Sequence, residues 1–362
     1  MRRLLPLFGI ICGTSHVSAQ ATQKNVPSSI ACAACQVNIT PIGTLATESG
    51  PGAIASLPLD LAQDTKGRVF LLEEAPNVAP RVYSSTGKFL RDIGRTGKGP
   101  NEYGRPSSVT ILQGDSILIL DGATRRISLL SPAFKFVDSE PLSSHLERAT
   151  PLSDGTMAVV AQIGSGDAIG FPVHRWSRDG KRINSFGVDS PFVMPAAYPL
   201  RPQLAAARNG NVWVAQETSY HISLWNGAGK KLVELRRAAS WFPSHEPRSI
   251  DSEHPPLPWI VALYEDATGL LWVFTLVPAK NWQAGLGKKI QTAEGRGYVN
   301  QDLALLYDTR IEVIDPSKGA LMATLTVPRL LAHPLRDGVV AGWRTNSDGA
   351  YVVELWKVTL QR

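Results

Sequence analysis

The chain has 362 residues, of which 43% are hydrophobic and 19% charged, with 31 glycines and 26 prolines. This balance excludes a disordered chain, and the length allows a large hydrophobic core. The abundance of glycine and proline predicts frequent turns. The formal net charge of +6 is mild, so basicity alone gives only a weak preference for acidic partners.

The first residues have the pattern of a secretory signal peptide. Two arginines precede an apolar run at 4–11, and Ala19 and Ala21 end two small-residue motifs suited to cleavage. The apolar run is too short to span a bilayer. We therefore expect a signal peptide over 1–21, a secreted or periplasmic protein, no transmembrane segment after cleavage, and no nucleic-acid partner.

Cys32 and Cys35 form a C-A-A-C motif in the predicted mature chain. An oxidising compartment favours a local disulfide between them. A redox-active pair would instead open a helix, whose dipole lowers the thiol pKa. Because β-favouring residues follow at Val37, Ile39 and Thr40, we favour the structural disulfide.

The sequence repeats one pattern six times. A tight polar turn containing glycine is followed each time by a strongly apolar strand. The turn glycines are Gly67, Gly114, Gly155, Gly210, Gly269 and Gly338. The strands that follow are apolar at successive positions, which is typical of strands covered on both faces. Repeated short strands with hairpin turns predict an all-β, six-bladed β-propeller of four-stranded blades.

The sixth repeat lacks one strand before the chain ends. The β-favouring run at 36–42 precedes the first repeat and can supply that strand, which would close the ring and remove an exposed sheet edge. We therefore divide the mature chain into an N-terminal segment at 22–56, with the cysteines and the closing strand, and a propeller at 57–362.

The motif GKGPNEYGRP at 97–106, followed by GDSILILD from Gly114, resembles NHL-type repeats. More closely, it is similar to secreted bacterial six-bladed propellers with a GxGPGEF-type loop, most of which have no assigned activity. The resemblance implies a fold and not a chemistry. Asn101 stands where that family usually has glycine, and asparagine tolerates the positive φ that such a loop needs.

Long connections are expected on one face of the ring. The short glycine turns join the first strand of each repeat to the second, so they share the opposite face. The long segments are 94–105, 162–172, 187–202, 237–259 and 275–308. Long loops on a compact scaffold often carry function, so their face is the candidate binding face. Tolerated insertion on an inert scaffold is the alternative.

Three arginines stand nine residues before a turn glycine, in alternate repeats: Arg105, Arg201 and Arg329. At the start of the innermost strands they could converge on one anion, because guanidinium groups suit carboxylates and phosphates. Arg148 lies two residues out of this register. Glu102 and Tyr103 of the 97–106 motif are further candidate binding residues. A common strand lead-in without a binding role explains the arginines equally well.

Two loops could have other roles. The 237–259 loop holds His245, Glu246, Asp251, Glu253 and His254, but without the regular spacing that fixes a metal site. We predict no metal there and no cofactor. The 275–308 segment carries Trp282, Lys288, Lys289, Arg296 and Tyr298, and is interpreted as a mobile lid, an arm that contacts a partner, or a disordered loop.

The sequence holds no nucleophile, phosphate-loop or zinc-protease motif. A binding scaffold for a protein, peptide or small anionic ligand, monomeric in solution, is therefore the favoured interpretation. A structural part of an envelope complex is a third class. The alternative is a metal-dependent hydrolase of the lactonase kind, with its site in the central channel. That chemistry needs acidic and amide side chains from several innermost strands, and Asp60 qualifies. His333 lies near the first strand of the sixth repeat without a partner.

Overall fold

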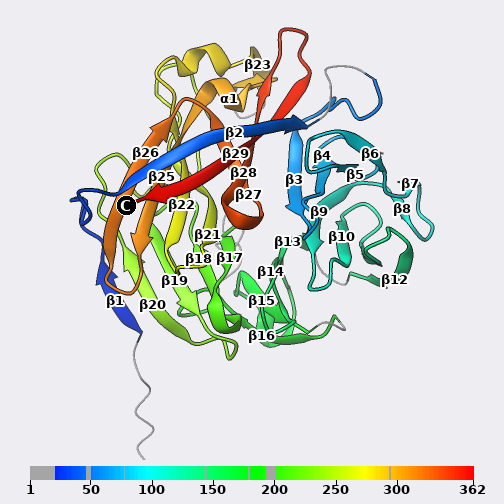
Figure 1. Cartoon of the computed structure of the whole chain (residues 1–362), viewed down its shortest axis with the longest axis horizontal. Helices are drawn as coiled ribbons and strands as arrows, with labels where there is room; N and C mark the ends of the chain where they lie inside the picture. Colours follow the sequence, from blue (N-terminus) through cyan, green and yellow to red (C-terminus); the bar gives the residue numbers. More distant parts are fainter. Residues whose placement is uncertain are drawn as a thin grey trace, which may run out of the picture.

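The computed structural model describes residues 21–45, 50–76, 78–142, 145–177, 180–192, 201–292 and 295–362. Six antiparallel sheets stand around a common axis, and each gives its first strand to the centre (Figure 1). The chain is a six-bladed β-propeller, as the repeats predict. The predicted signal peptide lies outside the described residues, apart from Ala21.

The first three blades follow one another directly along the chain. Their strands, from the axis outward, are β3 (Pro58–Gln63), β4 (Val69–Glu73), β5 (Arg81–Tyr83) and β6 (Phe89–Asp92); β9 (Pro106–Ile111), β10 (Ile117–Asp121), β11 (Arg126–Leu130) and β12 (Phe136–Pro141); and β13 (His145–Pro151), β14 (Met157–Gln162), β15 (Val173–Trp176) and β16 (Arg182–Phe186). The two-residue strands β7 (Arg95–Thr96) and β8 (Glu102–Tyr103) pair between blades one and two, and the short helix η1 (Gly166–Ala168) lies in blade three.

The last three blades use both ends of the chain. Their strands are β17 (Gln203–Ala206), β18 (Val212–Ala215), β19 (His221–Trp225), β20 (Lys231–Arg236) and the added β1 (Thr22–Asn25); β21 (Trp259–Glu265), β22 (Leu271–Pro278), β25 (Tyr307–Asp315) and β26 (Ala320–Val327); and β27 (Leu330–Pro334), β28 (Val339–Thr345), β29 (Tyr351–Gln361) and β2 (Gln36–Leu45). Two more short helices, η2 (Arg208–Gly210) and η4 (Arg336–Gly338), form first turns.

The second strand of each blade forms the core between neighbouring sheets. All five residues of β4 and of β10 are buried, and so are all four of β18. Strands with both faces covered lose the alternation of polar and apolar residues, which explains the continuous apolar runs. The turns before them need a left-handed backbone, as Gly67 shows with φ of 76°.

The N-terminal segment crosses the outer edges of blades four, five and six. β1 pairs in parallel with β20, Ile30 bridges to Leu321, and β2 pairs antiparallel with β29. The last pairing supplies the fourth strand of blade six. Cys32 and Cys35 form a disulfide in the turn just before β2.

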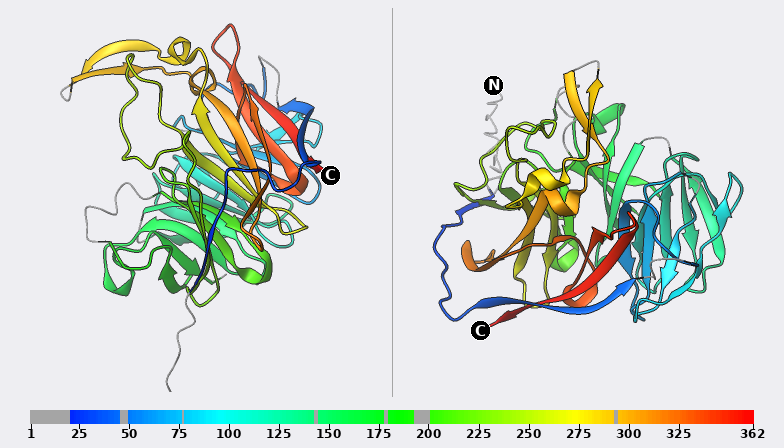
Figure 2. Two further views of the ribbon diagram at one scale, coloured as in Figure 1. Left: turned by 90° about the vertical axis from the view of Figure 1, so that its left-hand side faces the viewer. Right: turned by 90° about the horizontal axis from the view of Figure 1, so that it is seen from above.

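The 275–308 segment is ordered over its described part, which corrects the interpretation of a structureless loop. β22 continues to Pro278, and β25 already begins at Tyr307. Between them lie η3 (Trp282–Gly285), the hairpin of β23 (Lys288–Thr292) with β24 (Gly295–Val299), and α1 (Leu303–Leu306). The hairpin projects from the same side of the molecule as the 237–258 loop (Figure 2). No helix among the described residues is long and apolar enough to cross a membrane.

One buried carboxylate connects blades four and five. Glu312, fully buried on β25, accepts hydrogen bonds from Arg237 Nε at 2.8 Å, Tyr220 Oη at 2.8 Å and Arg310 Nε at 3.1 Å. Arg237 also donates to the carbonyl of Pro27 at 2.7 Å, which fixes the N-terminal segment to the same point. A buried charge of this kind is tolerated because all its partners are present.

Replacing Glu312 with Gln leaves Arg237 buried without a countercharge. We expect Glu312→Gln to lower the free energy of unfolding by about 3–5 kcal/mol, measured by urea denaturation. The matched control is Asp167→Asn, which removes an exposed partner of Arg182 and costs less than about 1 kcal/mol. Equal stability of the two variants would contradict this role of Glu312.

Candidate ligand site at the propeller axis

Six residues of the innermost strands occupy equivalent places near the axis. A β-bulge lies at this level in five blades, where the register of the first and second strands shifts by one residue. Bulges re-aim the side chains that follow them. The six residues are Asp60, Ser108, Arg148, Gln203, Ala262 and His333. We call them the axis ring.

Arg148 is the cation of the axis ring. Its side chain is half-buried, and its Nη1 donates a hydrogen bond to Oε1 of Gln203 in the next blade. Its charge acts on Asp60 of blade one and on His333 of blade six, so Arg148 reaches towards the centre of the ring. Among the described residues, no carboxylate lies within 4.0 Å of its guanidinium group. Arg148 therefore keeps donors available for a ligand.

Glu217 extends this network towards the long-loop face. It lies in the connection between β18 and β19, and its Oε1 accepts a hydrogen bond from Gln203 Nε2 at 2.7 Å. Burial raises the pKa of Glu217 to about 7, against the opposing effects of Gln203, Arg148 and Arg201. Glu217 therefore exchanges a proton near neutral pH, directly beside the Arg148–Gln203 pair.

Asp60 and His333 complete the ionisable part of the axis ring. The Asp60 carboxylate accepts hydrogen bonds at 2.9 Å from Ser108 Oγ and from the Val109 amide, which join blades one and two. Burial raises the pKa of Asp60, although Arg148 opposes this effect. Burial, with a smaller contribution from Arg148, lowers the pKa of His333 to about 3, so its imidazole is neutral at physiological pH.

The three predicted arginines have different surroundings. Arg201 forms an ion pair with Glu147 at 3.5 Å, and its charge acts on Glu217, so it lies at the edge of the axis site. Arg329 pairs with Glu354 at 3.1 Å and stacks on Trp356, both on the third strand of its own blade. Arg105 is exposed, and no contact joins its side chain to the other two among the described residues.

Glu102 and Tyr103 hold their own loop in place. The Glu102 carboxylate accepts hydrogen bonds from the amides of Lys98 at 3.0 Å and Gly99 at 2.8 Å, and pairs with Arg95. Tyr103 is fully buried and is not available to a ligand. Asn101 has φ of 57°, the conformation expected of the residue in that place. This motif therefore shapes the start of blade two.

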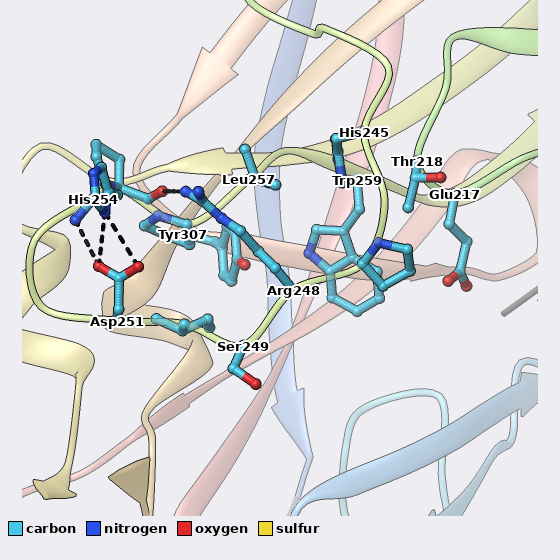
Figure 3. A pocket seen from close by; sticks show the side chains of 14 residues that line it. Glu217, Thr218, His245, Arg248, Ser249, Asp251, His254, Leu257, Trp259 and Tyr307 are labelled. Carbon is cyan, nitrogen blue, oxygen red and sulfur yellow. Dashed lines mark hydrogen bonds and ion pairs between the residues drawn. The ribbon is translucent and has the colours of Figure 1, made fainter. Parts of the chain in front are cut away.

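A pocket of about 200 Å³ lies beside Glu217 on the long-loop face. Its walls come from the 237–258 loop, from Trp259 at the start of β21 and from Tyr307 at the start of β25. In Figure 3, Glu217 lies at one end of the pocket with His245 and Trp259, and the Asp251–His254 pair lies at the other.

His245, Asp251 and His254 make side-chain contacts within their own loop. His245 contacts the Pro258 carbonyl at 2.7 Å, and Asp251 accepts hydrogen bonds from the amides of Glu253 and His254. In the part of the chain that the structure describes, no three His, Cys, Asp or Glu side chains are grouped so as to hold a metal ion.

Counting seven residues back from each turn glycine, instead of nine, would have identified much of the axis ring. Asp60, Arg148 and Gln203 each stand seven residues before their turn glycine, at Gly67, Gly155 and Gly210. The count of nine selects residues at the strand entrances. His333 is only five residues before Gly338, and Glu217 lies outside the innermost strands, so no single spacing identifies them.

Comparisons with known proteins agree with the fold. A family model described as a 6-bladed β-propeller, DUF5128, matches residues 59–140. No curated protein matches this sequence.

The similar solved structures share the architecture. A protein of Bacteroides fragilis that is named as exported has a TM-score of 0.58 at 12% identity, over 93% of this chain and 100% of its own. A member of the DUF4221 family from Bacteroides vulgatus has a TM-score of 0.59 at 9% identity, over 89% and 98%. A Bacteroides thetaiotaomicron protein of unknown function has a TM-score of 0.50 at 9% identity, over 89% and 76%. At these identities, the likeness concerns the fold alone.

The low pKa of His333 makes the protein acid-sensitive. The unfolded chain binds a proton at this residue near pH 6.5, whereas the folded chain does so only near pH 3. The stability that depends on neutral His333 is therefore complete above pH 6.5 and is lost as the pH falls towards 3. We expect His333→Asn to reduce the difference in unfolding free energy between pH 7 and pH 4.5.

The control is His254→Asn, because His254 is exposed in the 237–258 loop. Urea denaturation at both pH values measures the effect. If the unfolding free energy changed equally between pH 7 and pH 4.5 in His333→Asn and in the unmodified protein, His333 would not be the acid-sensitive residue.

Proposed function

We propose that this chain is an exported binding protein that holds a small, singly charged anion at the axis ring, with Arg148 as its anchor. The observation that carries the proposal is the position of Arg148. Arg148 is half-buried on an innermost strand and donates to a neutral amide, and its charge acts on Asp60 and His333 of other blades. No carboxylate of the described residues pairs with it. A guanidinium group in such a place binds a planar anion with two parallel hydrogen bonds.

The surroundings of Arg148 favour one negative charge over several. Asp60, Glu147 and Glu217 all lie near the site, and a multiply charged anion would be repelled by them. His333, whose imidazole is neutral at physiological pH, offers a further contact from the same axis ring. A carboxylate is therefore a better ligand than a doubly charged phosphate.

Export of the protein rests on two observations. The N-terminal sequence has the features of a signal peptide, and a similar propeller from Bacteroides fragilis is named as exported. A secreted or periplasmic binding protein would meet small organic acids outside the cytoplasm.

Removing the Arg148 charge tests the anchor. We expect Arg148→Gln to weaken acetate binding by at least tenfold, because a hydrogen bond to a charged group contributes about 1.5–3 kcal/mol. Arg148→Lys retains the charge and loses the forked geometry, so its affinity for acetate should lie between those of the unmodified protein and Arg148→Gln. Isothermal titration calorimetry measures the dissociation constants.

The matched control is Arg105→Gln, an exposed arginine at the start of blade two. Full affinity in Arg148→Gln would remove Arg148 as the anchor. If only the double variant Arg105→Ala with Arg201→Ala lost affinity, the three-arginine site predicted from the sequence would be favoured instead.

Glu217 gives the binding a pH dependence. Its carboxyl group loses a proton near pH 7 and then places a negative charge beside the Arg148–Gln203 pair. Acetate affinity should therefore fall as the pH rises from 6 to 8, by at most about tenfold per pH unit because one proton is involved.

Glu217→Gln cannot ionise and should bind acetate with the same affinity across this range. Glu253→Gln, in the exposed part of the 237–258 loop, should keep the pH dependence of the unmodified protein. A profile unchanged by Glu217→Gln would exclude Glu217 as the titrating group.

A further inference from the structure

The pocket beside Glu217 has an apolar wall. Three prolines, Pro247, Pro255 and Pro256, line it together with Ile250 and Leu257, and the Trp259 and Tyr307 rings, whose centroids are 6.3 Å apart, close one side. Leu257 and Ile250 are only half-buried although both are aliphatic. Covering an apolar wall of this kind with the apolar part of a ligand is favourable, because it removes apolar surface from water.

Two charged side chains of the pocket contact other residues of the 237–258 loop. Arg248 donates to the Pro255 carbonyl at 3.3 Å, and the imidazole of His254 lies 3.2 Å from an oxygen of Asp251. These contacts shape the loop, and most of the other side chains that line the pocket are aliphatic or aromatic. The pocket therefore selects the apolar part of a ligand.

Glu217 connects this pocket with the axis ring. Its side chain lines the pocket, and the same carboxyl group is 2.7 Å from Gln203, which in turn accepts a hydrogen bond from Arg148. An anion at Arg148 and an apolar group in the pocket would thus lie on two sides of one residue. Glu217 is therefore the residue that the pocket and the axis-ring network have in common.

We propose that the axis ring and the loop pocket form one site for an amphipathic monocarboxylic acid, whose carboxylate binds Arg148 while its hydrocarbon part lies against Leu257, Trp259 and Tyr307. This inference rests on the proposed function and adds the ligand class. The volume of about 200 Å³ is below the roughly 300–1,000 Å³ of sites for drug-sized ligands, so the ligand is small.

Acetate, hexanoate and 3-phenylpropionate test the hydrocarbon part, and hexanamide tests the charge. We expect hexanoate and 3-phenylpropionate to bind at least tenfold more tightly than acetate, since each buried methylene contributes about fourfold in affinity. Hexanamide should bind at least tenfold more weakly than hexanoate. Calorimetric titrations of the full mature chain at pH 6 give the dissociation constants.

Leu257→Asn should remove most of the preference for hexanoate over acetate. The matched control is Leu305→Asn, because Leu305 is 49% exposed on α1 and does not line the pocket. If Leu257→Asn does not fold, Leu257→Ala is used in its place, provided that its melting temperature equals that of the unmodified protein.

The possible outcomes separate the two proposals. Equal affinities for acetate and hexanoate, both abolished by Arg148→Gln, would overturn the amphipathic ligand and leave the anion site intact. A preference for hexanoate that Leu257→Asn and Leu257→Ala do not change would place the hydrocarbon elsewhere and overturn the inference. Binding of none of the carboxylates would overturn the proposed function itself.

Discussion

The buried Glu312 network fixes the two segments of blade four that line the loop pocket. Its partner Arg237 directly follows β20 and begins the 237–258 loop, whose residues form the pocket wall. Its second partner, Tyr220, ends the connection that carries Glu217. A fully buried carboxylate with three donors has few alternative arrangements, so these two segments are held at a fixed distance from blade five. The Glu312 contacts therefore position these two segments on the long-loop face.

The axis ring contains one arginine, Arg148, and one aspartate, Asp60, and these two side chains form no ion pair with each other. Arg148 and Asp60 each bond to neutral groups of the neighbouring blade, Gln203 and the Ser108–Val109 pair respectively. These contacts join blades three to four and one to two at the axis, so the same side chains stabilise the ring and create its electrostatic field. Burial raises the pKa of Glu217 against the opposing charge of Arg148, whereas burial and the charge of Arg148 both lower the pKa of His333.

The sequence predicts the architecture well because glycine turns and doubly covered strands leave strong local patterns. The turn at Gly67 and the apolar run of β4 are examples. The site is less accessible to such analysis, because it depends on where each innermost strand bulges. A single extra residue, such as Glu147 before Arg148, decides which side chain faces the axis. Glu217 joins the site only through the packing of a connection, and no sequence spacing encodes that contact.

The N-terminal crossing of blades four to six also affects how the chain must fold. Gln36 lies opposite Gln361, so one of the earliest described segments finds its strand partner only at the very end of the chain. Such a pairing closes a very long loop, and contacts of this range slow folding. During synthesis, β2 would stay unpaired with β29 until the ribosome has released β29. Blade six is therefore complete only when β29 is present, and a chain that ends before β29 would retain an open edge.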